Sequence, residues 1–209
     1  MSAGTPPRQL KDRLREVRTE LILDVAEEVL VEKGYHDTAM DEVAARAGIA
    51  KGTLYQHFPK KEDLGFALYE RGLLLFEQII QQAAASSSLT ARAKLEQILL
   101  AVYREHQGRK AHLLQLLYHD MDIRKSLLEK KGRLRERVEQ CAAQIRAIME
   151  QGRAAGEFDS TISLELVLMT FMHSLWFSRN EHLLIQQHLS PEEVSNQLGH
   201  ILFEGFASK

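Results

Sequence analysis

Two short amphipathic patterns flank Gly48 in residues 38–64, and this segment constrains the fold more than any other part of the chain. Thr38 is a suitable N-cap for the first helix, with Asp41 as its capping-box partner. Gly48 supplies the left-handed backbone conformation that lets a second helix leave at a steep angle. The second helix is predicted from about Lys51 to Phe58. Two short helices around a tight turn are typical of a helix-turn-helix.

The second helix buries one face and presents polar side chains on the other. Leu54 and Phe58 lie four residues apart and are predicted to face inward. In a helix-turn-helix, the first turn of this helix meets base edges, while flanking cations and hydroxyls hold phosphates. Gly52 would let the backbone come close to DNA. The side chains left to face outward are Lys51, Thr53, Tyr55, Gln56 and His57. DNA binding is the leading interpretation, and a helical hairpin with a solvated basic face is the alternative.

The stretch from Gly34 to Leu64 resembles the DNA-binding half of the TetR family of transcriptional regulators, above all in the run AGIAKGTLYQHFPKKEDL. The resemblance covers about 30 of the 209 residues. It implies base or sugar contacts for Lys51, Gly52 and Tyr55, and phosphate contacts for Thr38, Thr53, Tyr55, His57 and Lys61. Two positions depart from the pattern. Ala50 replaces the usual Ser cap, a loss of about 1 kcal/mol, and Ala39 replaces a frequent Thr.

Net charge does not mark the chain as a nucleic-acid binder, because the formal total is −2 and the pI is about 6.5. The distribution of charge is more informative. Between Arg46 and Lys61 there are four cations and no acid. Between Arg8 and Arg18 there are five cations and two acids, a local charge of +3. This N-terminal run fits a solvated helix face and a backbone-contacting arm equally well.

Every periodic segment is helical and none alternates as a strand would, so the chain is predicted to be all-α. An N-terminal three-helix DNA-binding domain with the helix-turn-helix is expected in residues 1–58. A helical effector-binding and dimerisation domain is expected in 59–209, which gives about nine helices in total. Besides the helix-turn-helix, helices are expected at about 9–33, from after Pro59 to about 84, and at 90–107, 110–119, 122–154, 161–187 and 191–207.

Three local signals mark the ends of helices. Gly34 is the expected C′ residue of the first helix. The loop that contains Gly156 resembles one that is common in TetR regulators before the penultimate helix. Ser190 and Glu193 form a capping box around Pro191, which starts the last helix.

The last two predicted helices carry more apolar surface than one small domain needs to bury internally. In the family, these helices form a four-helix interface with a second subunit. Twofold symmetry would then require a roughly palindromic operator. An ordinary intramolecular core is the alternative. The residues predicted at the dimer interface are Leu175, Val194, Leu198, Ile201 and Leu202.

TetR-type regulators usually bind a small-molecule effector between their middle helices, and the resemblance implies the same here. A largely apolar pocket with a few polar donors would suit a small apolar or aromatic effector. Each candidate residue also fits an ordinary core position. The candidates are Tyr103, His106, Leu117, Met121, Met149, Met169, His173 and Trp176.

Other chemistry has little support in the sequence. His112, His119 and Asp122 would share a face if their helix continued through Met121, which leaves a metal site open as a minor alternative. No resident cofactor is predicted. Cys141 lacks an evident His partner and no glycine-rich phosphate loop is present, so an enzyme is not expected.

The single cysteine cannot form an internal disulfide, which favours a reducing cytoplasm. No signal peptide is recognised at the start. The most apolar stretch, Ile162 to Phe177, is too short to span a membrane and is interrupted by Glu165 and His173. A soluble, cytoplasmic protein is expected.

The sequence therefore predicts a ligand-responsive DNA-binding regulator with double-stranded DNA, a small-molecule effector and a second copy of itself as partners. A homodimeric repressor that its effector releases from a palindromic operator is the expected form. The alternative of a different class is a DNA-independent helical small-molecule sensor or carrier, which would not need the polar set between Lys51 and Lys61.

Overall fold

The computed structural model describes residues 7–107, 133–175 and 189–204, and these residues form helices joined by turns with no strand among them. The all-α prediction is therefore confirmed for this part of the chain. The helices are α1 (Pro7–Asp37), α2 (Met40–Arg46), α3 (Lys51–His57), α4 (Lys61–Ala85), α5 (Ala91–Gln107), α8 (Arg133–Ala154), α9 (Leu164–Leu175) and α11 (Pro191–Glu204). None of the described helices is both long and apolar enough to cross a membrane.

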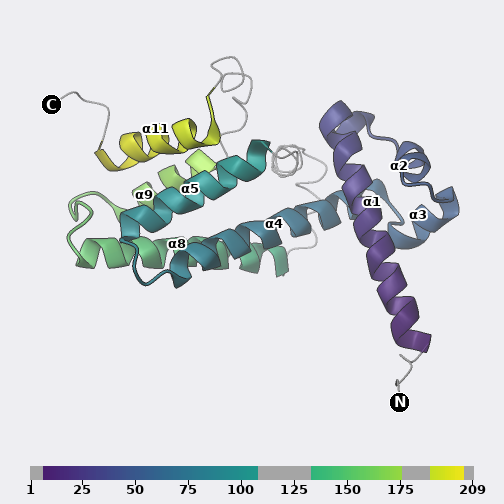
Figure 1. The fold of residues 1–209 in the computed structure, drawn as a ribbon, viewed down its shortest axis with the longest axis horizontal. Helices are drawn as coiled ribbons and strands as arrows, with labels where there is room; N and C mark the ends of the chain where they lie inside the picture. The colour runs from purple at the N-terminus through teal and green to yellow at the C-terminus, as the bar shows by residue number, and fades with distance from the viewer. Residues whose placement is uncertain (1–6, 108–132, 176–188, 205–209) are drawn as a thin grey trace.

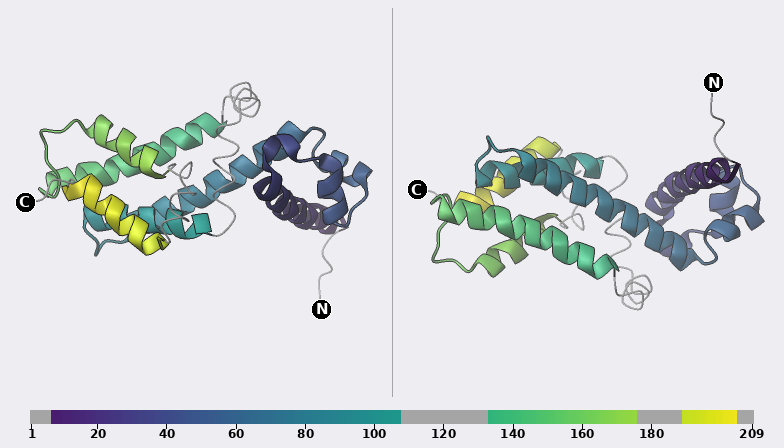
Figure 2. Two further views of the ribbon diagram at one scale, coloured as in Figure 1. Left: turned by 90° about the horizontal axis from the view of Figure 1, so that it is seen from above. Right: turned by 90° about the horizontal axis from the view of Figure 1, so that it is seen from below.

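The helices form two groups joined by α4 (Figure 1). The head consists of α1, α2 and α3 packed on the start of α4. The body consists of the rest of α4 with α5, α8, α9 and α11. Two further views show α4 leaving the head and running alongside α8 in the body (Figure 2). A movement of the body helices can therefore reach the head through a single continuous helix.

Most helix ends lie where the sequence places their stop and start signals. Gly48 has a φ of 64°, and the amide of Ile49 donates to the carbonyl oxygen of Ala44 at 3.0 Å, which closes the end of α2 as a Schellman turn. The capping box is also confirmed. The Ser190 amide donates to Glu193 Oε2 at 2.7 Å, and the Glu193 amide donates to Ser190 Oγ at 3.2 Å.

The predicted cap at Thr38 is wrong. The residue that caps α2 is Ala39, whose side chain makes no capping hydrogen bond. The Thr38 hydroxyl instead donates to the carbonyl oxygen of Gly34 at 2.7 Å. Gly34 has a φ of 78° inside α1, so the chain kinks there and exposes a carbonyl that the nearby hydroxyl satisfies. Competition between the two helix ends for one hydroxyl cannot be read from local spacing.

The first helix is longer than expected, and its apolar seam divides in two. From Ile22 to Leu30 the seam is buried against the head. Leu10, Leu14, Val17 and Leu21, however, are between 47% and 68% exposed, because this part of α1 extends beyond the packed head (Figure 1). The apolar face of α1 is therefore buried only in its second half. We call residues 10–21 the α1 arm.

Candidate nucleic-acid interface

The recognition helix α3 is anchored by its apolar side chains and turns its polar side chains outward. Leu54 is fully buried and Phe58 is buried just after the helix ends. The outward set comprises Lys51, Gly52, Tyr55 and Gln56, which are exposed, and Thr53 and His57, which are partly exposed. The helix-turn-helix thus brings these six predicted DNA-contact residues onto one short element.

Lys51 has an exposed partner within the head. Its Nζ atom lies 2.6 Å from Asp41 Oδ2, and this hydrogen bond raises the pKa of Lys51 above its ordinary value. Both side chains are about 60% exposed. A surface pair of this kind contributes little to stability, because water and salt screen both charges. Exchanging Asp41 for a phosphate or a base edge therefore costs little.

Lys61 is more firmly held. Its Nζ atom donates to the carbonyl oxygen of His36 at 2.9 Å and lies 4.6 Å from the centroid of the Tyr35 ring. The ammonium group thus satisfies a carbonyl at the end of α1 and forms a cation–π contact. Lys61 ties the end of α1 to the start of α4, so its replacement would also affect folding of the head.

Thr38 does not present its hydroxyl as a surface contact. The residue is 3% exposed, and its hydroxyl is bonded to the backbone of α1 as described above. Its placement favours a structural role at the junction between α1 and α2. The phosphate contact that the resemblance implies for Thr38 is therefore not available to this hydroxyl in the observed conformation.

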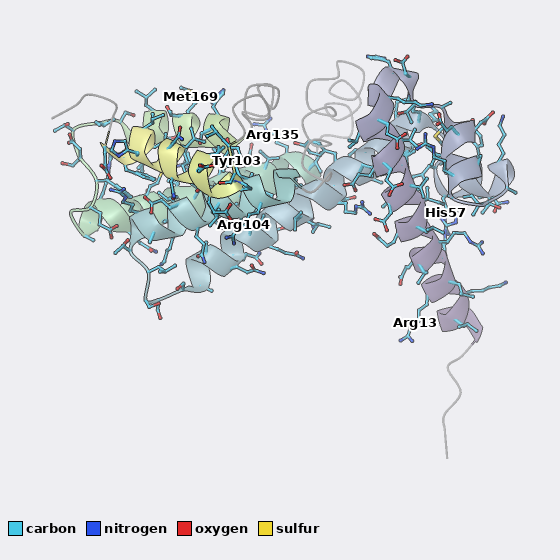
Figure 3. All side chains as sticks on the ribbon, turned by 45° about the horizontal axis from the view of Figure 1, so that its top comes forward. Arg13, His57, Tyr103, Arg104, Arg135 and Met169 are labelled. Carbon is cyan, nitrogen blue, oxygen red and sulfur yellow. The ribbon has the colours of Figure 1, made fainter. Side chains whose placement is uncertain are left out.

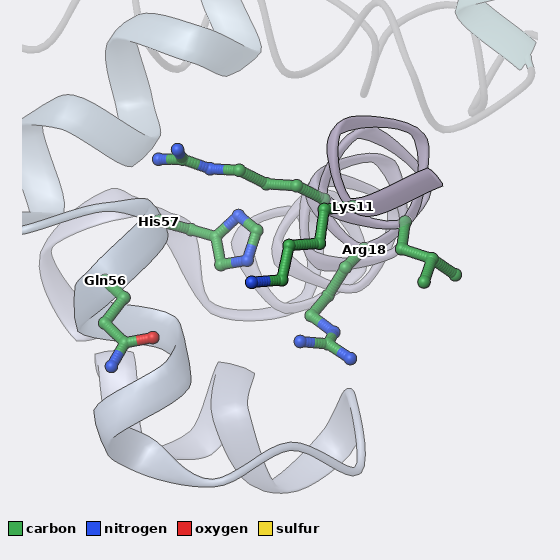
Figure 4. Close-up of a pocket in the computed structure, with 6 residues that line it drawn as sticks. Lys11, Arg18, Gln56 and His57 are labelled. Atoms are coloured by element: carbon green, nitrogen blue, oxygen red, sulfur yellow. The ribbon is translucent and has the colours of Figure 1, made fainter. Parts of the chain in front are cut away.

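A groove lies between the α1 arm and the end of α3 (Figure 4). It has a volume of about 490 Å³ and is open to solvent. In Figure 4, the Lys11 and Arg18 side chains extend from α1 on the side where His57 and Gln56 lie. The full lining is Lys11, Leu14, Arg15, Arg18, Gln56 and His57. We call this the basic groove, because it contains three cationic side chains and no acid.

His57 occupies the junction of the basic groove with α3. Its Nδ1 atom lies 2.9 Å from the Thr19 hydroxyl, which fixes the orientation of the ring. Burial lowers the pKa of His57, and the charges of Arg15 and Arg18 lower it further. The imidazole is therefore mainly neutral at pH 7 when the groove is empty of anions. Lys11, Arg15 and Arg18 give the groove a positive potential.

The comparisons with known proteins agree with this geometry. Residues 22–68 match the family described as bacterial regulatory proteins, tetR family. The chain is also 30% identical over 161 residues to the HTH-type transcriptional repressor KstR2 of Rhodococcus jostii, a match that covers 76% of each protein. The chain belongs to the TetR family. It is a DNA-binding transcriptional regulator and not an enzyme.

Two further matches cover almost the whole of this chain. The fatty acid metabolism regulator protein of Bacillus subtilis is 24% identical over 188 residues, which cover 90% of this chain and 95% of that protein. The crystal structure of the Bacillus subtilis transcriptional regulator FadR in complex with stearoyl-CoA superposes with a TM-score of 0.71. That match is 21% identical and covers 90% of this chain and 99% of the other, so it shows that the fold is shared.

The predicted effector residues of this TetR-family regulator fall in different places. Met149 is buried and lines a cavity of about 110 Å³ where α5, α8, α9 and α11 meet. Tyr103 is also buried, and its hydroxyl donates to the carbonyl oxygen of Ser174 at 2.7 Å. Burial raises the pKa of Tyr103 to about 12, so the phenol stays neutral. The structure does not place Tyr103 among the residues that line the cavity of Met149.

Met169 and His173 lie on the outer face of α9 and not in its core. Met169, labelled in Figure 3, is 51% exposed. His173 is also exposed, and its Nδ1 atom lies 2.7 Å from the carbonyl oxygen of Met169. Within the part of the chain that the structure describes, neither residue lines the cavity at Met149. The remaining candidates, Leu117, Met121 and Trp176, and the side chain of His106 lie outside the described residues, as do His112, His119 and Asp122. Sequence reasoning missed Leu95, Phe158 and Phe203, which line the cavity but whose apolar character alone gives no sign of it.

The residues predicted at the dimer interface differ in their burial. Leu175 and Val194 are buried within the single chain, which removes them from an outer contact surface. Leu198 and Leu202 are half-buried, and Ile201 is 49% exposed. A second exposed apolar row lies at Ile162, Leu166 and Met169, at the start and on the outer face of α9. The exposed apolar surface is thus centred on α9 more than the sequence indicated.

Proposed function

We propose that the chain is a homodimeric repressor that an acyl-CoA thioester, or a similar effector with a long apolar chain, releases from a palindromic operator. The relationship to the fatty acid metabolism regulator protein along almost the whole chain carries this proposal. The superposable Bacillus subtilis regulator was captured with stearoyl-CoA, which supports the same class of effector.

The interior of the body has the chemistry that an acyl chain needs. Its buried side chains are overwhelmingly aliphatic or aromatic, as in Ile98, Leu99, Ile145, Ile148 and Phe171. The cavity at Met149 is smaller than the roughly 300–1,000 Å³ of typical effector pockets. An acyl chain that enters there would have to separate helices that are now in contact. Binding would thus favour a different body arrangement from the one described, which is the requirement for allosteric control.

We propose the α9 surface as the centre of the dimer interface. Leu166 and Met169 on α9 are exposed, as is Ile162 just before this helix, and Ile201 offers a further exposed apolar side chain on α11. Twofold pairing through this surface would present two α3 helices to a palindromic operator.

Within each subunit, we propose residues 1–58 as the DNA-binding domain and 59–209 as the effector and dimer domain. Lys51, Gly52 and Tyr55 would approach bases or sugars, and Thr53, Gln56 and His57 would lie against the adjacent backbone. The exposure of these residues on α3 supports the assignment.

The test begins with genomic DNA fragments that the purified protein retains, because they supply the operator. The affinity for a labelled operator is then measured by fluorescence anisotropy with increasing stearoyl-CoA. Free coenzyme A and short-chain acyl-CoA are the matched controls. We expect stearoyl-CoA to lower operator affinity at least tenfold, within the usual allosteric range of about 1–3 kcal/mol. The coenzyme A control should have no effect.

A Met149→Trp variant provides a second readout, because it fills the cavity. It should keep operator affinity without ligand and lose most of the stearoyl-CoA response. Specific operator binding that no acyl-CoA of any chain length weakens would reject this effector class while leaving DNA recognition intact.

A further inference from the structure

We propose that the basic groove is a second DNA-binding element, in which the α1 arm holds the phosphate backbone just beyond the recognition helix. The inference rests on the DNA binding of the TetR-family head and does not depend on the identity of the effector. It assigns a ligand, the nucleic-acid phosphate, to side chains outside the helix-turn-helix.

The arm places its cations on one side of the helix. Lys11, Arg15 and Arg18 follow at intervals of four and three residues, so successive side chains stack along one face. From Lys11 to Arg18 the helix rises about 10 Å. Charges on one DNA strand follow each other every 3.4 Å along the duplex axis. The row of cations is therefore long enough to contact more than one phosphate.

The arm cations differ from Lys51 and Lys61 because no carboxylate or backbone carbonyl of the described residues already occupies them. Lys51 is paired with Asp41, and Lys61 is bonded to the backbone of α1. Within the part of the chain that the structure describes, Lys11, Arg15 and Arg18 form no ion pair with a carboxylate. Three unpaired cations around one groove repel each other, so an anion that enters stabilises all three.

The position of the groove identifies the anion as a DNA phosphate. Gln56 and His57 line one wall and belong to α3, whose exposed side chains face the proposed duplex. A duplex that lies on α3 therefore brings its backbone to the groove. The cationic lining of the groove gives it a positive potential that attracts phosphate.

The test uses Lys11→Ala, Arg15→Ala and Arg18→Ala, with Arg13→Ala as the matched control. Arg13 carries the same charge on the same arm, does not line the groove, and points away from the side of α1 on which His57 lies (Figure 3). Affinity for operator and for unrelated duplex DNA is measured at several salt concentrations without effector. Thermal unfolding checks that each variant is folded.

Each groove variant should weaken binding to both DNAs by a similar factor, because phosphate contacts carry no sequence information. The slope of log affinity against log salt should fall by up to about 0.9 for each lost phosphate contact. Arg13→Ala should change this slope by much less. Groove variants that behave like Arg13→Ala would overturn the proposal, even if operator recognition and the effector response are intact.

Neutral methylphosphonate substitutions in the operator locate the contact. Wild-type protein should lose affinity when a phosphate next to the recognised bases is neutralised. The Arg15→Ala protein, which already lacks this contact, should bind the neutralised DNA as well as it binds the unmodified operator. Additive losses at every phosphate would contradict the assignment. Full retention of DNA binding by the groove variants, together with lost binding to anionic phospholipid vesicles, would also overturn it, by assigning the groove to membranes.

Discussion

His57 shows how one residue joins the recognition helix to the α1 arm. Its ring is held by Thr19 of α1, while Arg15 and Arg18 repel a proton on it. Lys11 and Gln56 complete the groove around the ring. The sequence predicted a phosphate contact for His57 from resemblance alone. The structure adds the reason why its protonation should depend on the presence of DNA.

We predict that DNA affinity increases as the pH falls from about 8 to 6, and that His57→Gln removes a distinct part of this increase. The pKa of His57 is lowered in the free protein. A phosphate in the groove would neutralise the arginines and raise it, so binding takes up a proton. The increase in DNA affinity that His57 contributes is complete below its pKa in the free protein. This increase is lost as the pH rises through the pKa of His57 in the complex. One proton gives at most a tenfold change per pH unit.

Anisotropy titrations at a fixed salt concentration measure this difference. The same pH dependence in wild type and His57→Gln would show that His57 does not exchange a proton on binding. The folded protein alone should show the opposite linkage. Because its His57 pKa is lowered, the contribution of His57 to stability is lost as the pH falls through the ordinary value of 6.5.

At the scale of helices, one guanidinium links the head to the long helix of the body. Arg71 of α4 binds Asp24 Oδ1 of α1 at 2.8 Å, and its other terminal nitrogen donates to Glu27. Glu20 lies at 3.4 Å. These three acids stand on one face of α1 at intervals of four and three residues. Glu27 is buried whereas Glu20 and Asp24 are exposed, so the bond to Glu27 is the critical one.

We predict that Arg71→Met destabilises the protein by about 3 kcal/mol, because it leaves Glu27 charged and buried without its guanidinium partner. Adding Glu27→Gln should restore a large part of this loss. Glu20→Gln is the matched control and should cost less than about 1 kcal/mol, since the side chain is 64% exposed. Urea unfolding of wild type, Arg71→Met, Glu27→Gln and the double variant gives the coupling energy by a double-mutant cycle. A coupling energy near zero for Arg71 and Glu27 would refute the critical role of this bond.

At the scale of the whole molecule, α9 carries apolar side chains that the other described residues leave exposed. Leu166 and Met169 are both more than half exposed on a helix that is buried on its other side. Covering these side chains with a second copy would remove apolar surface from water, at about 25 cal/mol for each Å². Ile201 on α11 is a further exposed apolar side chain.

We predict that Leu166→Glu converts the dimer to a monomer of 23.8 kDa in sedimentation experiments and weakens operator binding with it. Leu74→Glu is the control, since Leu74 is also an exposed leucine, at 39%, but lies on α4. It should leave the dimer intact. A Leu166→Glu protein that remains dimeric would exclude α9 as the interface.

Interactions between residues that are close in the sequence determined where many of the helices begin and end. Gly48, the capping box at Ser190 and the amphipathic periods predicted the helix-turn-helix, the start of the last helix and the all-α class, because each depends on neighbours within a few residues. The same reasoning predicted which face of α3 is polar. It could not place Thr38, whose hydroxyl had two helix ends within reach.

Only the tertiary structure decided which surfaces of these helices are buried and which residues meet in space. Packing buries the second half of the first helix and leaves its arm exposed, although both halves carry the same apolar pattern. It also brings Arg15 and His57, which lie 42 positions apart in the chain, into one groove. Burial and charge proximity depend on which helices meet in space, and a helical period reports only that a face is apolar or charged. The sequence thus determined the described helices and the polar face of α3, and the fold decided which cations, carboxylates and apolar side chains are exposed to a partner.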